Sequence, residues 1–239
     1  MTTHLKSRNG SWKLNNKSKN NLIFDDPEAV IYKDKNDKVF LVKNGTTRQV
    51  QKALVPTIQA ELKKGHYACG YFSFEYNNKV ARKKDYKAIF NIYKKASIDN
   101  PQKTNNINTK TKFKKSSDIH FKNGIKKVKK YIEEGDIYQI NLTREFVFDS
   151  PNNPYSLFQD YYKLQPVEYA GFFKFHDHIL ISGSMELFVQ KIGNKITTAP
   201  IKGTAKPGTE QDRNLNKNKK ETAENLMIVD LMRNDLSRI

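Results

Sequence analysis

The sequence of 239 residues contains a single cysteine, Cys69, and no long apolar stretch. One thiol excludes an intramolecular disulfide and a zinc site built from cysteines, so we interpret Cys69 as a small buried hydrophobic residue. No segment approaches the roughly 18 consecutive apolar residues of a membrane-spanning helix. Residues 1–16 also lack the apolar segment that a signal peptide needs. We therefore expect a cytoplasmic protein that does not enter a membrane.

Acidic residues are scarce relative to basic ones. The chain has 43 Lys and Arg against 25 Asp and Glu, which gives a formal net charge of +18. Such an excess is compatible with a nucleic-acid partner or an anionic substrate. Many of the lysines, however, lie in Lys/Asn-rich stretches such as residues 100–117 and 214–220, which is typical of a solvated surface. The aromatic residues fall at core-periodic positions instead of between the basic ones, so a nucleic-acid-binding module is the less favoured interpretation.

The spacing of the apolar residues predicts an α+β fold in which antiparallel sheets are flanked by helices. Hairpins are predicted for residues 29–32 with 38–42, 169–175 with 179–184, and 187–192 with 195–198. Helices are predicted for a segment from Val50 to Gly65 in which Pro56 indicates a break or a late start, and for residues 118–134, 153–164 and 219–234. The last of these is apolar on nearly all sides in its second half, so we expect it to be buried on several sides.

Residues 138–148 alternate between apolar and polar side chains, which predicts a strand with two different faces. Gln139, Asn141 and Thr143 share the polar face. This face is compatible with a ligand-binding surface, and also with the solvent side of an edge strand.

Glu186 and Lys202 lie at the open end of the last predicted hairpin. A two-residue turn at Gly193-Asn194 pairs Glu186 with Ile201, whereas a three-residue loop places Glu186 directly opposite Lys202. An acid and an amine therefore meet at this end of the hairpin. They form either a plain cross-strand salt bridge or a pair of reactive groups.

Glu221 and Glu224 are three residues apart in the last predicted helix, so both carboxylates lie on one face. Carboxylate oxygens beside a buried run are suitable ligands for Mg²⁺. Two glutamates in a first helical turn are equally explained by their favourable interaction with the helix dipole. The two interpretations stay open at the level of these residues.

Three strings are specific enough to identify a family. They are GDIYQINLTREF at residues 135–146, PIKGT at residues 200–204, and AENLMIVDLMRNDLSRI at residues 223–239. Together they resemble the chorismate-utilising enzymes, and within that family the aminodeoxychorismate synthase component I branch. The resemblance is strong over residues 119–239 and looser over residues 22–95, where GYFSFEY is similar to the N-terminal part of the family.

Two positions distinguish the branches of this family. Gln139 stands where the members that add water to chorismate carry a lysine base. Lys202 is retained, whereas anthranilate synthases typically have alanine at that position of PIKGT. The resemblance therefore implies the amination of chorismate to 4-amino-4-deoxychorismate, for 4-aminobenzoate and folate synthesis. Anthranilate synthase component I is the alternative within the family.

The resemblance also implies roles for single residues. Lys202 would be a covalent nucleophile and Glu186 the acid that helps the C4 hydroxyl to leave, which requires a neutral amine, a protonated carboxyl and therefore a closed site. Glu224, with Glu221, would hold Mg²⁺. The substrate would contact Gln139, Asn141, Gly203 and Thr204. A separate glutamine amidotransferase subunit would supply ammonia.

The resemblance suggests a division into four parts. Residues 1–20 would be a polar arm, residues 21–98 the N-terminal part of the component I-like fold, and residues 99–117 a Lys/Asn-rich linker. Residues 118–239 would be the first portion of the chorismate-binding domain. Family members continue well beyond the DLMRND motif, so we expect the fold to be truncated at its C-terminus, the chain to be an N-terminal fragment, and residues 1–239 alone to be inactive.

Overall fold

The computed structural model describes residues 1–9, 11–14, 17–77, 86–98, 112–114, 118–149 and 153–238. These residues divide into two compact units. One unit comprises Met1–Gln102 and Asp160–Ile239, and the other comprises Lys103–Gln159. Every strand pair among the described residues is antiparallel, and helices accompany the sheets, which confirms the predicted α+β class.

A five-stranded sheet forms one layer of the larger unit. Its strand order among the described residues is β7-β6-β5-β9-β8, and these strands are β5 (Ala29–Asp34), β6 (Val39–Lys43), β7 (Thr46–Val50), β8 (Tyr67–Phe72) and β9 (Tyr86–Tyr93). The predicted first hairpin is confirmed, with Val30 paired to Val42. Central strand β9 is largely buried, so this sheet anchors the packing of the unit.

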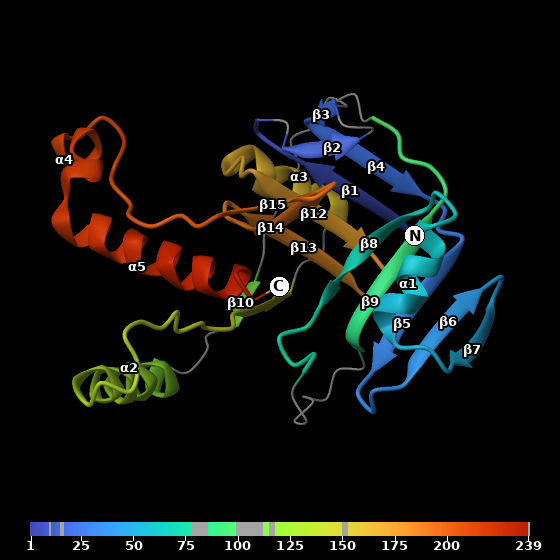
Figure 1. The fold of residues 1–239 in the computed structure, drawn as a ribbon, viewed down its shortest axis with the longest axis horizontal. Coiled ribbons are helices and arrows are strands. Elements are labelled where there is room, and N and C mark those ends of the chain that lie inside the picture. The colour runs from blue at the N-terminus through green and yellow to red at the C-terminus, as the bar shows by residue number, and fades with distance from the viewer. Residues whose placement is uncertain are drawn as a thin grey trace. The chain divides into compact units, whose positions relative to one another are not determined.

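Helix α1 (Leu54–Leu62) covers one face of this sheet (Figure 1). Leu54 and Ile58 are buried against Ile31 and other apolar side chains of the sheet. The late start that Pro56 indicated is confirmed, because Pro56 lies in the first turn, where its missing N–H removes no helical hydrogen bond. Val50, which shares the four-residue spacing, ends strand β7 instead.

A four-stranded sheet forms the second layer, and it corrects the prediction of a loose N-terminal arm. Its order is β13-β12-β1-β4 among the described residues, with β1 (Thr2–Lys6), β4 (Asn21–Asp25), β12 (Tyr169–Lys174) and β13 (Ile179–Ser184). Strand β1 lies between β4 and β12, and its Thr3 and Leu5 are buried. The prediction of an arm is wrong because a short polar segment has no sequence pattern that indicates burial. Its burial comes from the two strands that flank it in the sheet. In the sequence, β1 and β4 are separated by strands β2 (Trp12–Leu14) and β3 (Lys17–Lys19), which pair with each other in a small hairpin.

The two sheets share a hydrophobic core. Leu5, Leu22 and Phe24 of the four-stranded sheet pack with Cys69 and Tyr93 of the five-stranded one. Burial raises the pKa of the Cys69 thiol to about 12, so the thiol stays protonated and unreactive. The prediction that Cys69 is a buried hydrophobic residue is confirmed.

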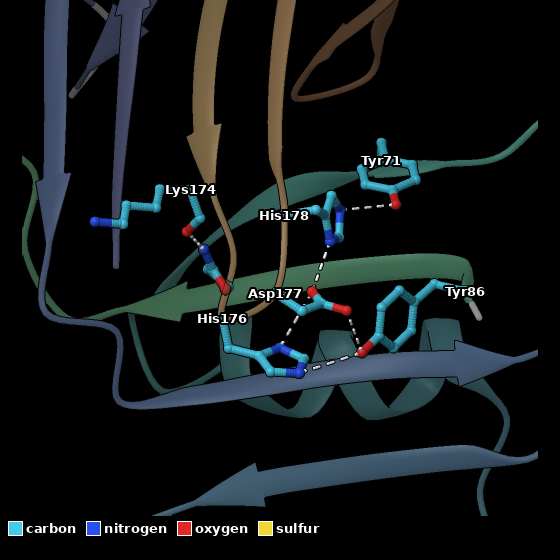
Figure 2. A network of polar contacts seen from close by, with 7 residues as sticks. Tyr71, Tyr86, Lys174, His176, Asp177 and His178 are labelled. Atoms are coloured by element: carbon cyan, nitrogen blue, oxygen red, sulfur yellow. Dashed lines mark hydrogen bonds and ion pairs between the residues drawn. The ribbon is translucent and has the colours of Figure 1, made fainter. Parts of the chain in front are cut away.

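The tip of the β12–β13 hairpin, His176-Asp177-His178, forms a polar network with the five-stranded sheet (Figure 2). The Asp177 carboxylate accepts a hydrogen bond from His178 Nδ1 at 2.7 Å and one from the Tyr86 hydroxyl at 3.2 Å. His178 Nε2 forms a hydrogen bond with the Tyr71 hydroxyl at 3.0 Å. This network therefore ties the second sheet to strands β8 and β9.

Asp177→Asn is expected to destabilise the larger unit by about 1 kcal/mol or less at neutral pH, because the carboxylate is partly exposed. Burial acts to raise the pKa of Asp177, but the hydrogen bonds and the nearby imidazoles hold it below its ordinary value of 3.8. A depressed carboxyl pKa stabilises the fold above the ordinary value and loses that effect as the pH falls through the lowered one. Urea unfolding should therefore show a difference between the proteins that is constant above about pH 5 and shrinks below about pH 4. A difference that grows on acidification would contradict this assignment.

The smaller unit contains β10 (Lys112–Lys114), α2 (Asp118–Glu133), β11 (Val147–Asp149) and the beginning of α3 (Pro154–Leu164). The two predicted helices are confirmed, and Asn153 Oδ1 accepts a hydrogen bond from the Tyr155 N–H at 2.8 Å at the start of α3. The strand predicted for residues 138–148 is wrong except at Val147 and Phe148, which pair with β10 as part of β11. Alternation alone does not make a strand, since its backbone groups need a neighbouring strand. Of the predicted linker, only residues 112–114 lie within the described residues.

The larger unit ends with β14 (Leu187–Ile192), β15 (Lys195–Ala199), α4 (Glu210–Arg213), a 3₁₀ turn η1 (Leu215–Lys217) and α5 (Lys219–Leu236). The last hairpin and helix are confirmed. The expected burial of the helix is wrong, because α5 has no buried residue among those described, and Leu226 and Leu231 are 59% and 54% exposed. None of the helices in the described ranges has the length and hydropathy of a membrane span.

Candidate active site

The β14–β15 hairpin decides between the two predicted registers. Ile192 pairs with Lys195 across a two-residue turn, and Gln190 pairs with Thr197. An irregularity between Leu187 and Gln190 then shifts the register by one, so that Leu187 pairs with Ala199. Such a bulge re-aims the side chains beyond it. Glu186 thus leaves the hairpin beside the PIKGT segment.

The Glu186 carboxylate contacts that segment directly. Its Oε1 accepts a hydrogen bond from the Ile201 N–H at 3.2 Å, one residue before Lys202. Glu186 is exposed and Lys202 is half-buried. The closed environment expected around these two groups is therefore not formed at Glu186 in this structure.

Lys202 lines a cavity of about 510 Å³ together with the start of α5. This volume lies in the range of about 300–1,000 Å³ that small-molecule sites typically have. Among the described residues, the charged side chains at its wall are Lys202, Arg213 and Glu221, two cations and one anion. The described residues that line it are Lys202, Arg213, Leu215, Asn216, Glu221, Thr222 and Asn225.

Gly203 and the first turn of α5 pack closely. Asn218 caps the helix by accepting hydrogen bonds from the N–H groups of Lys220 and Glu221, at 3.0 and 3.3 Å. Gly203 has a φ of +85°, and a Cβ at this position would lie 3.1 Å from Glu221 Oε2. The glycine thus allows both the left-handed backbone and the close approach of the Glu221 carboxylate.

Gly203→Ala is expected to lower the free energy of unfolding more than Gly208→Ala does. Both glycines have positive φ, so both substitutions cost about 1–2 kcal/mol of backbone strain. Only the first also crowds a neighbour, because a Cβ at Gly208 meets nothing within 4 Å. Urea unfolding of the two variants measures the difference. Equal losses would show that the Glu221 carboxylate moves aside without cost.

Glu221 and Glu224 fit a Mg²⁺ ion that takes its other ligands from water and substrate. They lie one turn apart on α5, both half-buried, and Glu221 faces the cavity. No group of three or more His, Cys, Asp or Glu residues that could hold a metal occurs in the described part of the chain. Mg²⁺ is commonly held by only one or two protein carboxylates, so the donor set is compatible with it.

Gln139 and Asn141 lie in the smaller unit, in a segment without strand structure, and both are exposed. Lys202, Glu186, Gly203, Thr204, Glu221 and Glu224 all lie in the larger unit. Within it, Lys202 and Glu221 line one cavity, Gly203 contacts Glu221, and Glu186 contacts the same loop, while Thr204 is exposed beside them. The role predicted for Gln139 and Asn141 at this site stays a prediction.

A sequence profile of the chorismate binding enzymes matches residues 87–239. The chain belongs to this family. The match includes the hairpin, the PIKGT segment and helix α5, so the cavity lies within the part of the chain that defines the family. The family predicted from the three strings is thereby confirmed.

Several curated relatives match half of the chain. Aminodeoxychorismate synthase component 1 of Bacillus subtilis is 37% identical over 125 residues, which is 50% of this chain and 27% of that protein. Anthranilate synthase component 1 of Acetivibrio thermocellus is 34% identical over 125 residues, which is 50% of this chain and 25% of that protein. Aminodeoxychorismate synthase component 1 of Salmonella typhimurium is 34% identical over 120 residues, covering 48% and 26%. The matched part of the chain spans about a quarter of the length of these relatives.

Arg213 and Asn225 line the cavity but were missed by the sequence reasoning. Arg213 lies beside a Lys/Asn-rich run that looks like solvated surface. Asn225 could have been found, because it is four residues after Glu221 and therefore on the same face of the helix. Arg213 could not readily be predicted from the sequence. Its position at the cavity wall depends on how the segment between the PIKGT motif and α5 folds.

Proposed function

We propose that the site aminates chorismate with ammonia to give 4-amino-4-deoxychorismate, the precursor of 4-aminobenzoate for folate synthesis. The observation that carries this proposal is Lys202, an amine at the wall of the cavity whose neighbouring loop residue Ile201 binds the Glu186 carboxylate. Membership of the family supports chorismate as the substrate. Lys202 and Arg213, the two cations among the described residues of the cavity wall, also suit a dianionic substrate.

In the proposed reaction, Lys202 and Glu186 act as a pair. The neutral Nζ of Lys202 attacks C2 of chorismate, both ring double bonds shift by one position, and the C4–O bond breaks. Protonated Glu186 gives its proton to the departing hydroxyl, which leaves as water. Ammonia then forms a bond to C4, both double bonds shift back, and the Nζ–C2 bond breaks to regenerate the neutral lysine. The ammonium group formed at C4 returns a proton to the Glu186 carboxylate.

Both groups must be uncharged at the start of this reaction, which needs a less hydrated environment than the exposed Glu186 has here. Glu224 and Glu221 would hold Mg²⁺ at the cavity, where it would neutralise a carboxylate of the substrate. We further propose that ammonia comes from a glutamine amidotransferase subunit, because no described cavity residue suggests glutamine hydrolysis. The cavity would then have to close around the substrate.

The alternative is anthranilate synthase component I, which uses the same substrate and ammonia but eliminates pyruvate. It is supported by relatives of that name at 34–36% identity, close to the 37% of the Bacillus subtilis aminodeoxychorismate synthase. The retained Lys202 favours amination without elimination. Because the sequence identities are so similar, they do not distinguish the two activities, and product analysis is needed to do so.

The test uses residues 1–239 joined to the part of the Bacillus subtilis relative that follows its matched segment, hereafter the extended chain. It is incubated with chorismate, ammonium and Mg²⁺, and the products are identified by liquid chromatography and mass spectrometry. We expect 4-amino-4-deoxychorismate, and none when ammonium is omitted. Anthranilate as the sole product would overturn the proposal in favour of the alternative.

A further inference from the structure

The backbone of Glu186 is held by the hydroxyl of Ser184, the last residue of β13. Ser184 Oγ donates a hydrogen bond to the Glu186 carbonyl oxygen at 3.1 Å and accepts one from the Glu186 N–H at 3.4 Å. One hydroxyl thus engages both main-chain polar groups of the residue two positions later, a local arrangement that serine favours. It fixes the peptide planes on either side of the Glu186 Cα.

The side chain of Glu186 is held at its other end by the Ile201 N–H, at 3.2 Å from Oε1. Glu186 therefore has three hydrogen-bonded points, namely its N–H, its carbonyl and its carboxylate. Two of the three depend on Ser184. Across the hairpin, Thr198 Oγ1 donates to the Leu187 carbonyl at 3.3 Å and supports the register just beyond.

Packing does not hold Glu186 in place. Its neighbour Met185 is 53% exposed, and Phe188, two residues later, is 76% exposed. A residue between such neighbours gains little orientation from buried contacts. Its direction must come from hydrogen bonds and the hairpin register.

We propose that Ser184 is a positioning residue, whose hydroxyl orients Glu186 so that its carboxylate stays on the Ile201 N–H, one residue before Lys202. This inference rests on the proposed function for its catalytic meaning, but its structural content is independent of it. A misplacement of about 1 Å at a reacting group can cost about a hundredfold in rate, so a single hydroxyl that fixes two peptide planes is significant.

The first test measures hydrogen exchange at the Ile201 amide by mass spectrometry with single-amide resolution, in residues 1–239 at a low concentration where light scattering shows a monomer. Ser184→Ala should speed the exchange severalfold, toward the rate in Glu186→Ala, which lacks the accepting carboxylate. Ser184→Thr keeps the hydroxyl and should restore the slow exchange. Ser182→Ala is the matched control, because Ser182 is a half-buried serine on the same strand, two residues earlier, and it should leave the rate unchanged. Equal exchange in Ser184→Ala and the unsubstituted chain would overturn the proposal.

The second test measures kcat and KM of the extended chain. Ser184→Ala should lower kcat about tenfold or more with little change in the KM for chorismate, and Ser184→Thr should recover most of it. A loss confined to KM would show that Ser184 acts on substrate binding and would overturn the positioning role. If the unsubstituted extended chain forms no aminated product, the proposed function fails, while the exchange result still decides whether Ser184 positions Glu186.

Discussion

Residues 1–239 by themselves are expected to show no measurable amination of chorismate, even with excess ammonium and Mg²⁺. Glu186 is exposed and Lys202 only half-buried, so neither group lies in the closed environment that the proposed chemistry needs.

The surface of the same region supports this expectation. Phe188 on β14 is 76% exposed, and Leu226 and Leu231 on α5 are 59% and 54% exposed. Exposed large apolar side chains favour association, so a tendency to aggregate is expected as well. The measurement is product formation by the purified chain, with light scattering to determine its association state. Turnover by a soluble monomer would show that the site needs no further covering and would contradict the prediction.

The second large effect is expected for Lys202→Ala in the extended chain. Removing a covalent nucleophile should lower kcat by at least about 10³-fold, with only slow direct amination remaining. Intact-protein mass spectrometry after an acid quench should detect a chorismate-derived adduct on the unsubstituted chain and none on the variant. The adduct is expected because Lys202 faces the cavity with Glu221 and Arg213.

Lys202→Arg is the matched control, since it keeps the positive charge but supplies no neutral amine. If Lys202 only attracted the substrate by its charge, this variant would keep most of the activity. A loss as large as that of Lys202→Ala supports the nucleophile. An adduct that persists in Lys202→Ala would instead place the covalent bond on another residue. It would contradict the role of Lys202 as the nucleophile.

The sequence predicted well those turns and helix ends that are determined by neighbouring residues in the chain. The two-residue turn at Gly193-Asn194 fixes the last hairpin, because these residues adopt the backbone angles that the turn requires. Asn153 and Pro154 start α3 through a side-chain cap and a preset φ. Gly135, with a φ of +79°, marks the end of α2 for the same kind of reason.

The elements that the sequence predicted poorly depend on partners distant in the chain. Strand β1 is a short polar segment that becomes a central strand because β4 and β12 flank it. Residues 138–146 have a clear alternation and still form no strand among the described residues, because only residues 147–149 pair with a neighbour. Helix α5 has the composition of a buried helix and lies exposed. Composition indicates which surfaces require burial, but not what buries them.

For the site, the sequence by itself determined the family and the position of Glu186 next to the PIKGT segment, and it predicted the types of the reactive residues. These features can be predicted from the motifs and from the spacing within the hairpin, because they depend on residues that are close to one another in the chain. Only the tertiary structure placed Lys202, Arg213 and Glu221 around one cavity, since this depends on the loop between PIKGT and α5 folding back on the helix start. It alone also showed the bulge that aims Glu186 at Ile201, since a one-residue shift in pairing leaves no trace in the alternation of side chains.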